Sequence, residues 1–73
     1  MKTLNQLEKN EIAIVRKIYA TGDLKQRLSS FGVFKGTEIK VESCSVGKQT
    51  MKVKVGKTKI AFRLEEAKQI EVE

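Results

Sequence analysis

Residues 50–63 read TMKVKVGKTKIAFR, and they carry the most informative pattern in the chain. Apolar and charged residues alternate on both sides of Gly56, as in two β-strands with one buried face. Glycine at the first of two loop positions is typical of a tight hairpin between strands, here Thr50–Val55 and Thr58–Arg63. The register of such a loop places apolar side chains in opposed pairs on one face: Met51 with Phe62 and Val53 with Ile60.

The other face of the predicted hairpin carries Lys52, Lys54 and Lys59, with Lys57 in the turn. Lys54 lies directly opposite Lys59 in this register, and like charges so placed are destabilising. A cationic face of this kind predicts a docking surface for an acidic protein patch, nucleic acid or anionic lipid headgroups. The alternative interpretation is a solvated face whose lysines only oppose aggregation.

Three further strands are predicted around the hairpin. Glu11–Ile18 is rich in β-branched residues, and Gln69–Val72 reads as a short closing strand. In Thr37–Cys44, apolar Ile39 and Val41 alternate with charged residues, which indicates one buried face.

A short helix is predicted for about residues 23–31. Asp23 is the expected N-cap, and Gln26 three residues later completes a capping box. Gly32 follows directly, where a left-handed residue can end the helix. The spacing places three apolar side chains on one face: Leu24, Leu28 and Phe31.

These elements predict a mainly β fold, a small SH3-like barrel of about five strands with one short inserted helix. Brief helical turns are expected at residues 3–7 and 64–67. A chain of 73 residues without a linker or repeat is expected to form one domain, residues 1–73. Short strands in an open sheet expose their edges, whereas a closed barrel removes them. The polar start, and the lack of any run approaching about 18 apolar residues, favour a cytoplasmic protein.

The composition argues against catalysis. The chain has no His, the commonest general base, and its single Cys cannot form an internal disulfide. Glu65 and Glu66 could act as acid and base, but adjacent carboxylates more often mark the N-terminal turn of a helix. No set of nucleophile, base and orienting group can be assembled, so we expect no enzymatic activity.

Glu42 and Cys44 are weak candidates for a metal site. They could form half of a soft-metal site, but two ligands do not close one. For Cys44 the favoured alternative is a small buried apolar residue.

The net charge of +6 makes nucleic acid a rival partner. Small barrels bind bases by stacking them on exposed aromatic side chains. Periodicity assigns Phe31 and Phe62 to the core, and it leaves Tyr19 and Phe34 unplaced. A stacking platform is therefore missing or minimal, which leaves contact with phosphates alone.

Residues 27–41 read RLSSFGVFKGTEIKV, and residues 51–70 read MKVKVGKTKIAFRLEEAKQI. Together with Thr3-Leu4 and Leu7, these segments resemble the FeoA family, the ferrous iron transport protein A domains. The first segment is similar to the family pattern RLxxLGLxPGTxVxV. The resemblance covers nearly the whole chain, in order and without gaps.

The chain departs from the family pattern at three positions. Asn10 replaces a customary Gly, Phe34 a smaller residue and Lys35 a Pro. Asn tolerates the left-handed backbone conformation best after Gly, so the first change is mild. Lys35 removes a rigid residue from the turn that ends at Gly36.

The resemblance implies an SH3-like barrel that serves as a cytosolic accessory protein of ferrous iron uptake. Such a protein docks on the cytoplasmic face of the FeoB membrane GTPase transporter and modulates it, and a peripheral approach to the membrane is compatible with this. The residues expected to bind the partner are Lys52, Lys54, Lys57, Lys59, Arg27, Gly32 and Gly36.

Fe2+ or another transition metal is implied as a ligand by the resemblance alone. Two alternatives remain open: a basic barrel that binds nucleic acid, and a metal-sensing regulatory domain like those at the C-termini of iron-dependent repressors.

Overall fold

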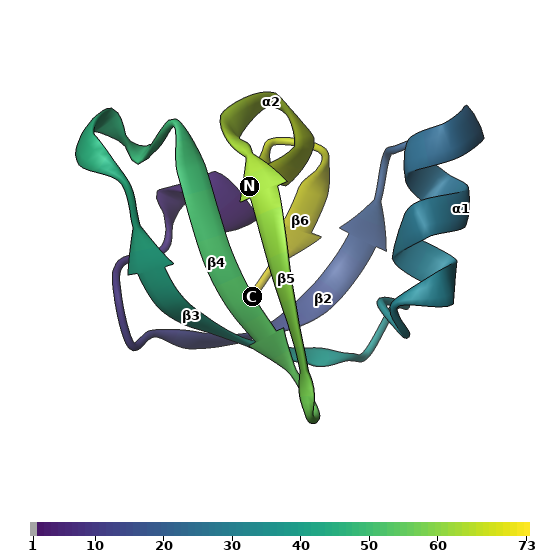
Figure 1. Cartoon of the computed structure of the whole chain (residues 1–73). Helices are drawn as coiled ribbons and strands as arrows, with labels where there is room; N and C mark the ends of the chain where they lie inside the picture. Colours follow the sequence, from purple (N-terminus) through teal and green to yellow (C-terminus); the bar gives the residue numbers. More distant parts are fainter. Residues whose placement is uncertain (1) are drawn as a thin grey trace.

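The computed structural model of the protein describes residues 2–73; Met1, the first residue of the predicted domain, lies outside the described residues. The elements follow the predicted order of strand, helix, three-strand meander and closing strand (Figure 1). The strands are β1 (Lys2–Thr3), β2 (Ile12–Ile18), β3 (Glu38–Cys44), β4 (Thr50–Val55), β5 (Thr58–Arg63) and β6 (Ile70–Val72). The helices are α1 (Gly22–Ser30) and α2 (Leu64–Ala67), with 3-10 turns η1 (Leu4–Gln6) and η2 (Val46–Lys48).

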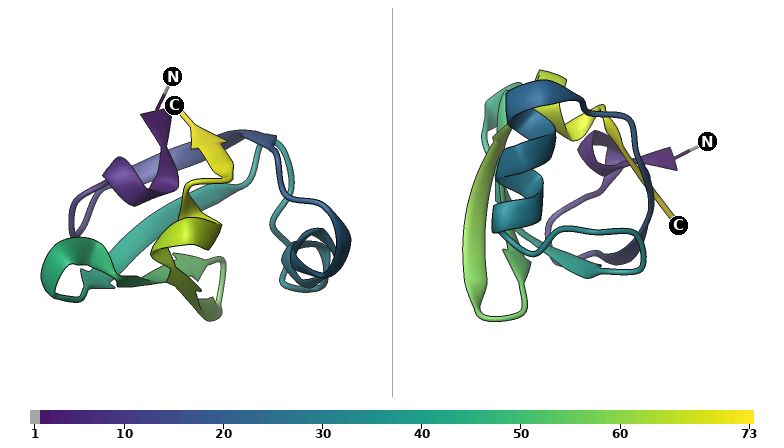
Figure 2. Two further views of the ribbon diagram at one scale, coloured as in Figure 1. Left: turned by 90° about the horizontal axis from the view of Figure 1, so that it is seen from above. Right: turned by 90° about the vertical axis from the view of Figure 1, so that its right-hand side faces the viewer.

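The strands form one antiparallel sheet in the order β1-β6-β2-β3-β4-β5. Residues 12–14 of β2 pair with β3, and residues 15–18 pair with β6, so this strand passes from one half of the sheet to the other. The sheet bends around its core into the predicted mainly β barrel (Figure 2). Strand β1 is additional to the five predicted strands. It was not predicted, because a strand of two residues is too short to show an alternating pattern.

The β4–β5 hairpin has the predicted register. Val53 pairs with Ile60, Met51 with Phe62, and Lys54 with Lys59. Gly56 takes a φ of +60°, as the first position of a tight hairpin loop requires. Alternation is complete along β4, where every second residue is buried.

The interior is apolar throughout the described chain, because no polar or charged residue among residues 2–73 is buried. Both halves of the sheet, η1, α1 and α2 contribute to it. Its largest fully buried side chains are Phe62, Leu4, Leu7, Leu28, Ile39, Met51 and Ile70.

Helix α1 begins one residue before the predicted position, with Thr21 rather than Asp23 as the N-cap. Gly22 takes a φ of +62°, a conformation that costs glycine little, and the chain turns there into the helix. Asp23 thus lies in the first helical turn, where its charge suits the positive end of the helix dipole.

The prediction that Phe31 belongs to the core is wrong. Phe31 is the C-cap of α1 and is 37% exposed, whereas Val33 is buried. Gly32 has a φ of +81°, and the Val33 N–H donates to the Leu28 carbonyl at 2.8 Å, which reverses the chain in a Schellman motif. Because the helix ends at Ser30, the side chain of Phe31 no longer lies on its buried face, and Val33 packs into the core instead.

Two of the family departures fit their local backbone. Asn10 adopts a left-handed φ of +73°, as expected of the residue that replaces Gly. Lys35 lies in a turn in which the Thr37 N–H donates to the Phe34 carbonyl at 3.0 Å and Gly36 has a φ of +93°. Gly36 supplies the positive φ that a type II turn needs, so the turn forms without proline.

Because Leu28 is the buried residue of α1, we predict that it anchors this helix to the barrel. Leu28→Ala removes a fully buried side chain and is expected to lower the free energy of unfolding by about 2–5 kcal/mol. The half-buried Leu24 on the same helix gives the matched variant Leu24→Ala, with a smaller expected loss. Urea denaturation of both variants measures the difference. Equal losses would show that α1 is not held through Leu28.

Candidate docking surface

Five exposed lysines gather on the outer face of β3, β4 and β5, and we call them the lysine surface: Lys40, Lys52, Lys54, Lys57 and Lys59. Lys54 has Lys40 opposite it on β3 and Lys59 opposite it on β5. Three like charges therefore stand in one row across three strands, a destabilising arrangement. The predicted register of the hairpin placed Lys54 opposite Lys59, but Lys40 was not predicted to belong to this surface.

A bulge in β3 moves a carboxylate away from Lys52. The β3–β4 register shifts between Val41 and Ser43, so Ser43 rather than Glu42 is the partner of Lys52. In a regular ladder Glu42 would lie directly opposite Lys52 and offset its charge. The Glu42 carboxylate instead comes within 4.0 Å of the Lys59 ammonium group.

The remaining ion pairs of residues 2–73 lie away from the lysine surface. They join Lys2 to Glu11, Arg16 to Glu71 and Glu73, Arg27 to Glu66, and Lys48 to Glu8. Six acidic side chains are engaged in this way once Glu42 is included. None of the ion pairs within residues 2–73 involves Lys40, Lys52, Lys54 or Lys57, so four of the five lysines of this surface are not neutralised by an ion pair.

A groove of about 680 Å³ adjoins the lysine surface, and we call it the Ile12 groove. Ile12 is the ladder partner of Lys40, and its side chain is 58% exposed. Phe31 and Val55 add apolar area, while Lys40 and Lys54 supply positive charge. The groove is also lined by Gly32, Thr37, Glu38 and Gly56. The exposed Phe31 thus forms part of a groove wall.

The other sequence-predicted docking residues lie in different places. Gly32 lines the Ile12 groove. The Gly36 N–H donates to the Val15 carbonyl at 2.7 Å and so ties the turn to β2. Arg27 is engaged with Glu66 of α2 at 3.1 Å, so its charge holds α1 to the barrel.

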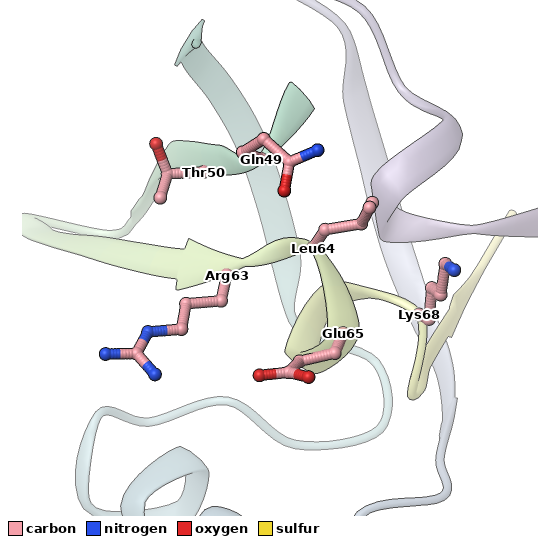
Figure 3. Close-up of a pocket in the computed structure, with 6 residues that line it drawn as sticks. All are labelled: Gln49, Thr50, Arg63, Leu64, Glu65 and Lys68. Atoms are coloured by element: carbon pink, nitrogen blue, oxygen red, sulfur yellow. The ribbon is translucent and has the colours of Figure 1, made fainter. Parts of the chain in front are cut away.

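A second pocket of about 430 Å³ lies where β5 meets α2, at the end of β5 opposite the hairpin turn (Figures 1 and 3). Arg63 and Glu65 extend to the same side of it, with Lys68 farther along (Figure 3). The Leu64 N–H donates to the Gln49 carbonyl at 2.9 Å and fixes this corner. Its charges are of both signs, and we assign no ligand to it.

Glu65 and Glu66 occupy the first turn of α2, as predicted from their preference for a helix N-terminus. Glu66 accepts from the Arg63 N–H at 2.9 Å and from Arg27 at 3.1 Å. Its carboxylate is thus used in holding α1, β5 and α2 together.

Both aromatic residues that the sequence left unplaced are exposed, Phe34 by 53% and Tyr19 by 44%. The Tyr19 hydroxyl donates to Glu71 at 2.7 Å, which raises the pKa of the phenol, and the Lys17 ammonium lies 4.9 Å from its ring centre. Neither residue lines the Ile12 groove.

The comparisons with known proteins agree with this fold. The family model of the FeoA domain matches residues 2–73. This chain belongs to the FeoA family. A Campylobacter jejuni protein named "Putative Fe(2+) transport protein A" is 37% identical over 70 residues, which cover 96% of this chain and 95% of that one. FeoA proteins are accessory proteins of ferrous iron transport, and they are not a known enzyme family.

Solved FeoA structures superpose well on the barrel. Stenotrophomonas maltophilia FeoA, solved with zinc and described as an SH3 domain protein, has a TM-score of 0.86 and 31% identity over 100% of this chain and 91% of that one. Iron(II) transport protein A from Clostridium thermocellum has a TM-score of 0.89 and 28% identity. That match covers 97% of this chain and 44% of that one, so the chain spans less than half of that protein.

Among the described residues of this FeoA chain, the two candidate metal ligands, Glu42 and Cys44, lie in different surroundings. Cys44 is a half-buried free thiol packed against the core, and Glu42 lies at the β3 bulge near Lys59. Within residues 2–73 no group of three or more Cys, Asp or Glu side chains is placed to hold a metal ion. Two candidate ligands do not complete a site.

None of the helices described in residues 2–73 has the length and apolar character needed to cross a membrane. The longest of them, α1, has nine residues and one buried side chain.

The opposed lysines predict that Lys54 lowers stability. Lys54→Glu places a carboxylate between Lys40 and Lys59, and it is expected to raise the free energy of unfolding by about 0.5–1 kcal/mol. Urea denaturation at low ionic strength measures the gain, which added salt should reduce. Lys68→Glu, after α2, is the control with the same charge change. A loss of stability in Lys54→Glu would contradict the opposed-charge argument.

Glu11 is predicted to give acid-sensitive stability. Its carboxylate accepts from the Glu8 N–H at 2.7 Å and lies 3.5 Å from Lys2, and chiefly the hydrogen bond holds the pKa of Glu11 below its ordinary value. A lowered folded-state pKa stabilises the fold above the unfolded-state value, and this contribution disappears as pH falls through the folded-state value.

Glu11→Gln should therefore be less stable than the parent near neutral pH, and the difference should shrink below the folded-state pKa. Urea denaturation as a function of pH measures it. A difference that persists unchanged into acid would show that the carboxylate charge is not responsible.

Proposed function

We propose that this FeoA protein is a non-catalytic module that docks through its lysine surface on the cytoplasmic face of a FeoB-type transporter and modulates its GTP-coupled gating. The row of three directly opposed lysines, Lys40, Lys54 and Lys59, carries this proposal. Ion pairs engage acidic side chains elsewhere, while Lys40, Lys52, Lys54 and Lys57 are exposed and take part in none of the ion pairs of residues 2–73. Such a surface attracts an acidic patch over the range of the Debye length and orients it on approach.

The energetic cost of the row supports a docking role over a merely solvated face. Exposed lysines help to keep a sheet surface soluble, but solubility does not require three of them in direct opposition. Lys54 is repelled by both Lys40 and Lys59, which lowers the stability of the fold. The β3 bulge also displaces the Glu42 carboxylate that would offset the charge of Lys52. A partner carboxylate seated on this row would relieve the repulsion, so docking would also stabilise the barrel.

A binding role also suits the remaining chemistry of the chain. The carboxylates that could act as acid and base, Glu65 and Glu66, serve in the first turn of α2. The chain contains no His to complete a nucleophile and base. These features favour recognition of another macromolecule over conversion of a small one.

The double charge reversal Lys54→Glu with Lys59→Glu should abolish binding to the purified cytoplasmic GTPase region of the FeoB transporter. The two reversals replace attraction with repulsion at the centre of the row and at its β5 end, so we expect affinity to fall by at least about 100-fold. Isothermal titration calorimetry at two ionic strengths measures the affinity and its salt dependence. Urea denaturation confirms that the variant is folded.

Lys68→Glu serves as the control, because it makes the same charge change per site at the C-cap of α2, away from the lysine surface. Equal loss in Lys68→Glu would indicate a general charge effect rather than this surface. Unchanged binding in the double reversal would refute the proposed surface. If the parent protein binds any DNA duplex with an affinity that falls steeply with salt, the nucleic-acid alternative is favoured.

A further inference from the structure

We propose that the Ile12 groove receives a large apolar side chain from an acidic segment of the partner, whose carboxylates lie on Lys40 and Lys54. The inference rests on the proposed docking function and names the chemistry of the segment that docks. It assigns recognition to two adjoining features, an apolar groove and the cationic row beside it.

The apolar part of the groove is formed by residues from three separate parts of the chain. Ile12 comes from β2, Phe31 from the end of α1 and Val55 from β4. Ile12 and Phe31 are 58% and 37% exposed, and they belong to the small group of large apolar residues that the described chain leaves in contact with solvent. Burial of these surfaces against an apolar side chain removes them from water together, which favours binding.

The charged part of the groove is in register with this apolar part. Ile12 is opposite Lys40, which is opposite Lys54, which is opposite Lys59. One row across four strands thus runs from an exposed aliphatic side chain to three ammonium groups. A segment lying along this row would place an apolar anchor at the Ile12 end and carboxylates toward β5.

The single carboxylate among the described lining residues is Glu38. It lies on β3 two residues before Lys40 and makes none of the ion pairs of residues 2–73. Glu38 would repel the carboxylates of an acidic segment. It therefore favours the orientation in which the partner's carboxylates lie on the Lys54 side of the groove. Its removal should therefore strengthen binding, the opposite of what removal of a lysine does.

The shape of the site favours a peptide segment over a membrane. Residues that insert into a bilayer project from a convex tip or an amphipathic helix face. Ile12 and Phe31 instead line a concave groove, while the most exposed large apolar residue, Val46 at 97%, lies outside it on η2. A side chain can enter such a groove, but a bilayer surface cannot follow it.

The test uses synthetic peptides and so does not depend on the transporter. One peptide carries Glu residues around a central Leu-Phe pair. A second keeps the Glu residues and replaces Leu and Phe by Ser, and a third keeps Leu and Phe and replaces Glu by Gln. Fluorescence anisotropy gives affinities, and amide chemical shifts of the 15N-labelled protein locate the site. We expect the first peptide to bind at least about tenfold more tightly than either control and to shift amides around Ile12, Phe31 and Val55.

Matched variants separate the two parts of the site. Ile12→Thr keeps a β-branched residue in the strand and should weaken the first peptide several-fold, whereas Val46→Thr, the same change outside the groove, should not. Lys40→Gln should weaken binding, and Glu38→Gln should strengthen it. All four positions are solvent-exposed, so urea denaturation should show folded proteins.

Equal binding of the first two peptides would overturn the groove proposal and leave a purely electrostatic surface. No binding, or shifts confined to other faces, would also overturn it. Pelleting with phosphatidylglycerol vesicles that is lost in Ile12→Thr would overturn it in favour of a membrane. Binding of the first peptide by a protein that does not bind the transporter region would support the groove and refute the proposed partner, so the two failures are distinguishable.

Discussion

The pairing of β4 with β5 is the interaction on which both the core and the exposed surface depend. Side chains alternate along a strand, so the register that turns Val53 and Ile60 inward also turns Lys54 and Lys59 outward. A slip by one residue would move the apolar set to solvent and the lysines to the core. Burial of the apolar pairs therefore stabilises, indirectly, an opposed-lysine arrangement that is unfavourable by itself. The lysine surface is as rigidly defined as the core beneath it.

The exposed surface is held at its edges by contacts of a different kind. Strand β2 belongs to both halves of the sheet, and Ile12 at its start is fixed by pairing with β3. Phe31 is fixed by the chain reversal after α1, in which Val33 rather than Phe31 enters the core. The two exposed apolar residues of the groove thus owe their positions to two independent elements. A change in how α1 packs would alter the groove without disturbing the lysine row.

The sequence predicted the features that local patterns determine and missed those that need tertiary pairing. Strict alternation around Gly56 defined the hairpin, its register and the Lys54–Lys59 pair. Lys40 escaped notice because its position beside Lys54 depends on β3–β4 pairing, and a bulge shifts that register after Val41. Phe31 was wrongly assigned to the core because the apolar spacing of a helix extends to residue 31 in the sequence, whereas the helix itself ends at Ser30. Residue type and spacing do not show where two such elements meet, so the groove could not be predicted.

The distribution of charge explains how a small chain can combine a stable barrel with a repulsive surface. Ion pairs at the periphery, such as Arg27 with Glu66 and Lys48 with Glu8, engage carboxylates at places where they join separate elements. Each exposed pair contributes little to stability, and its carboxylate lies away from the lysine surface. The β3 bulge has the same consequence for Lys52. The lysine row on the outer face of β3–β5 therefore faces solvent with only the β3 carboxylates of Glu38 and Glu42 beside it. The carboxylates of a docked partner would neutralise the lysines that form no ion pair within the described chain.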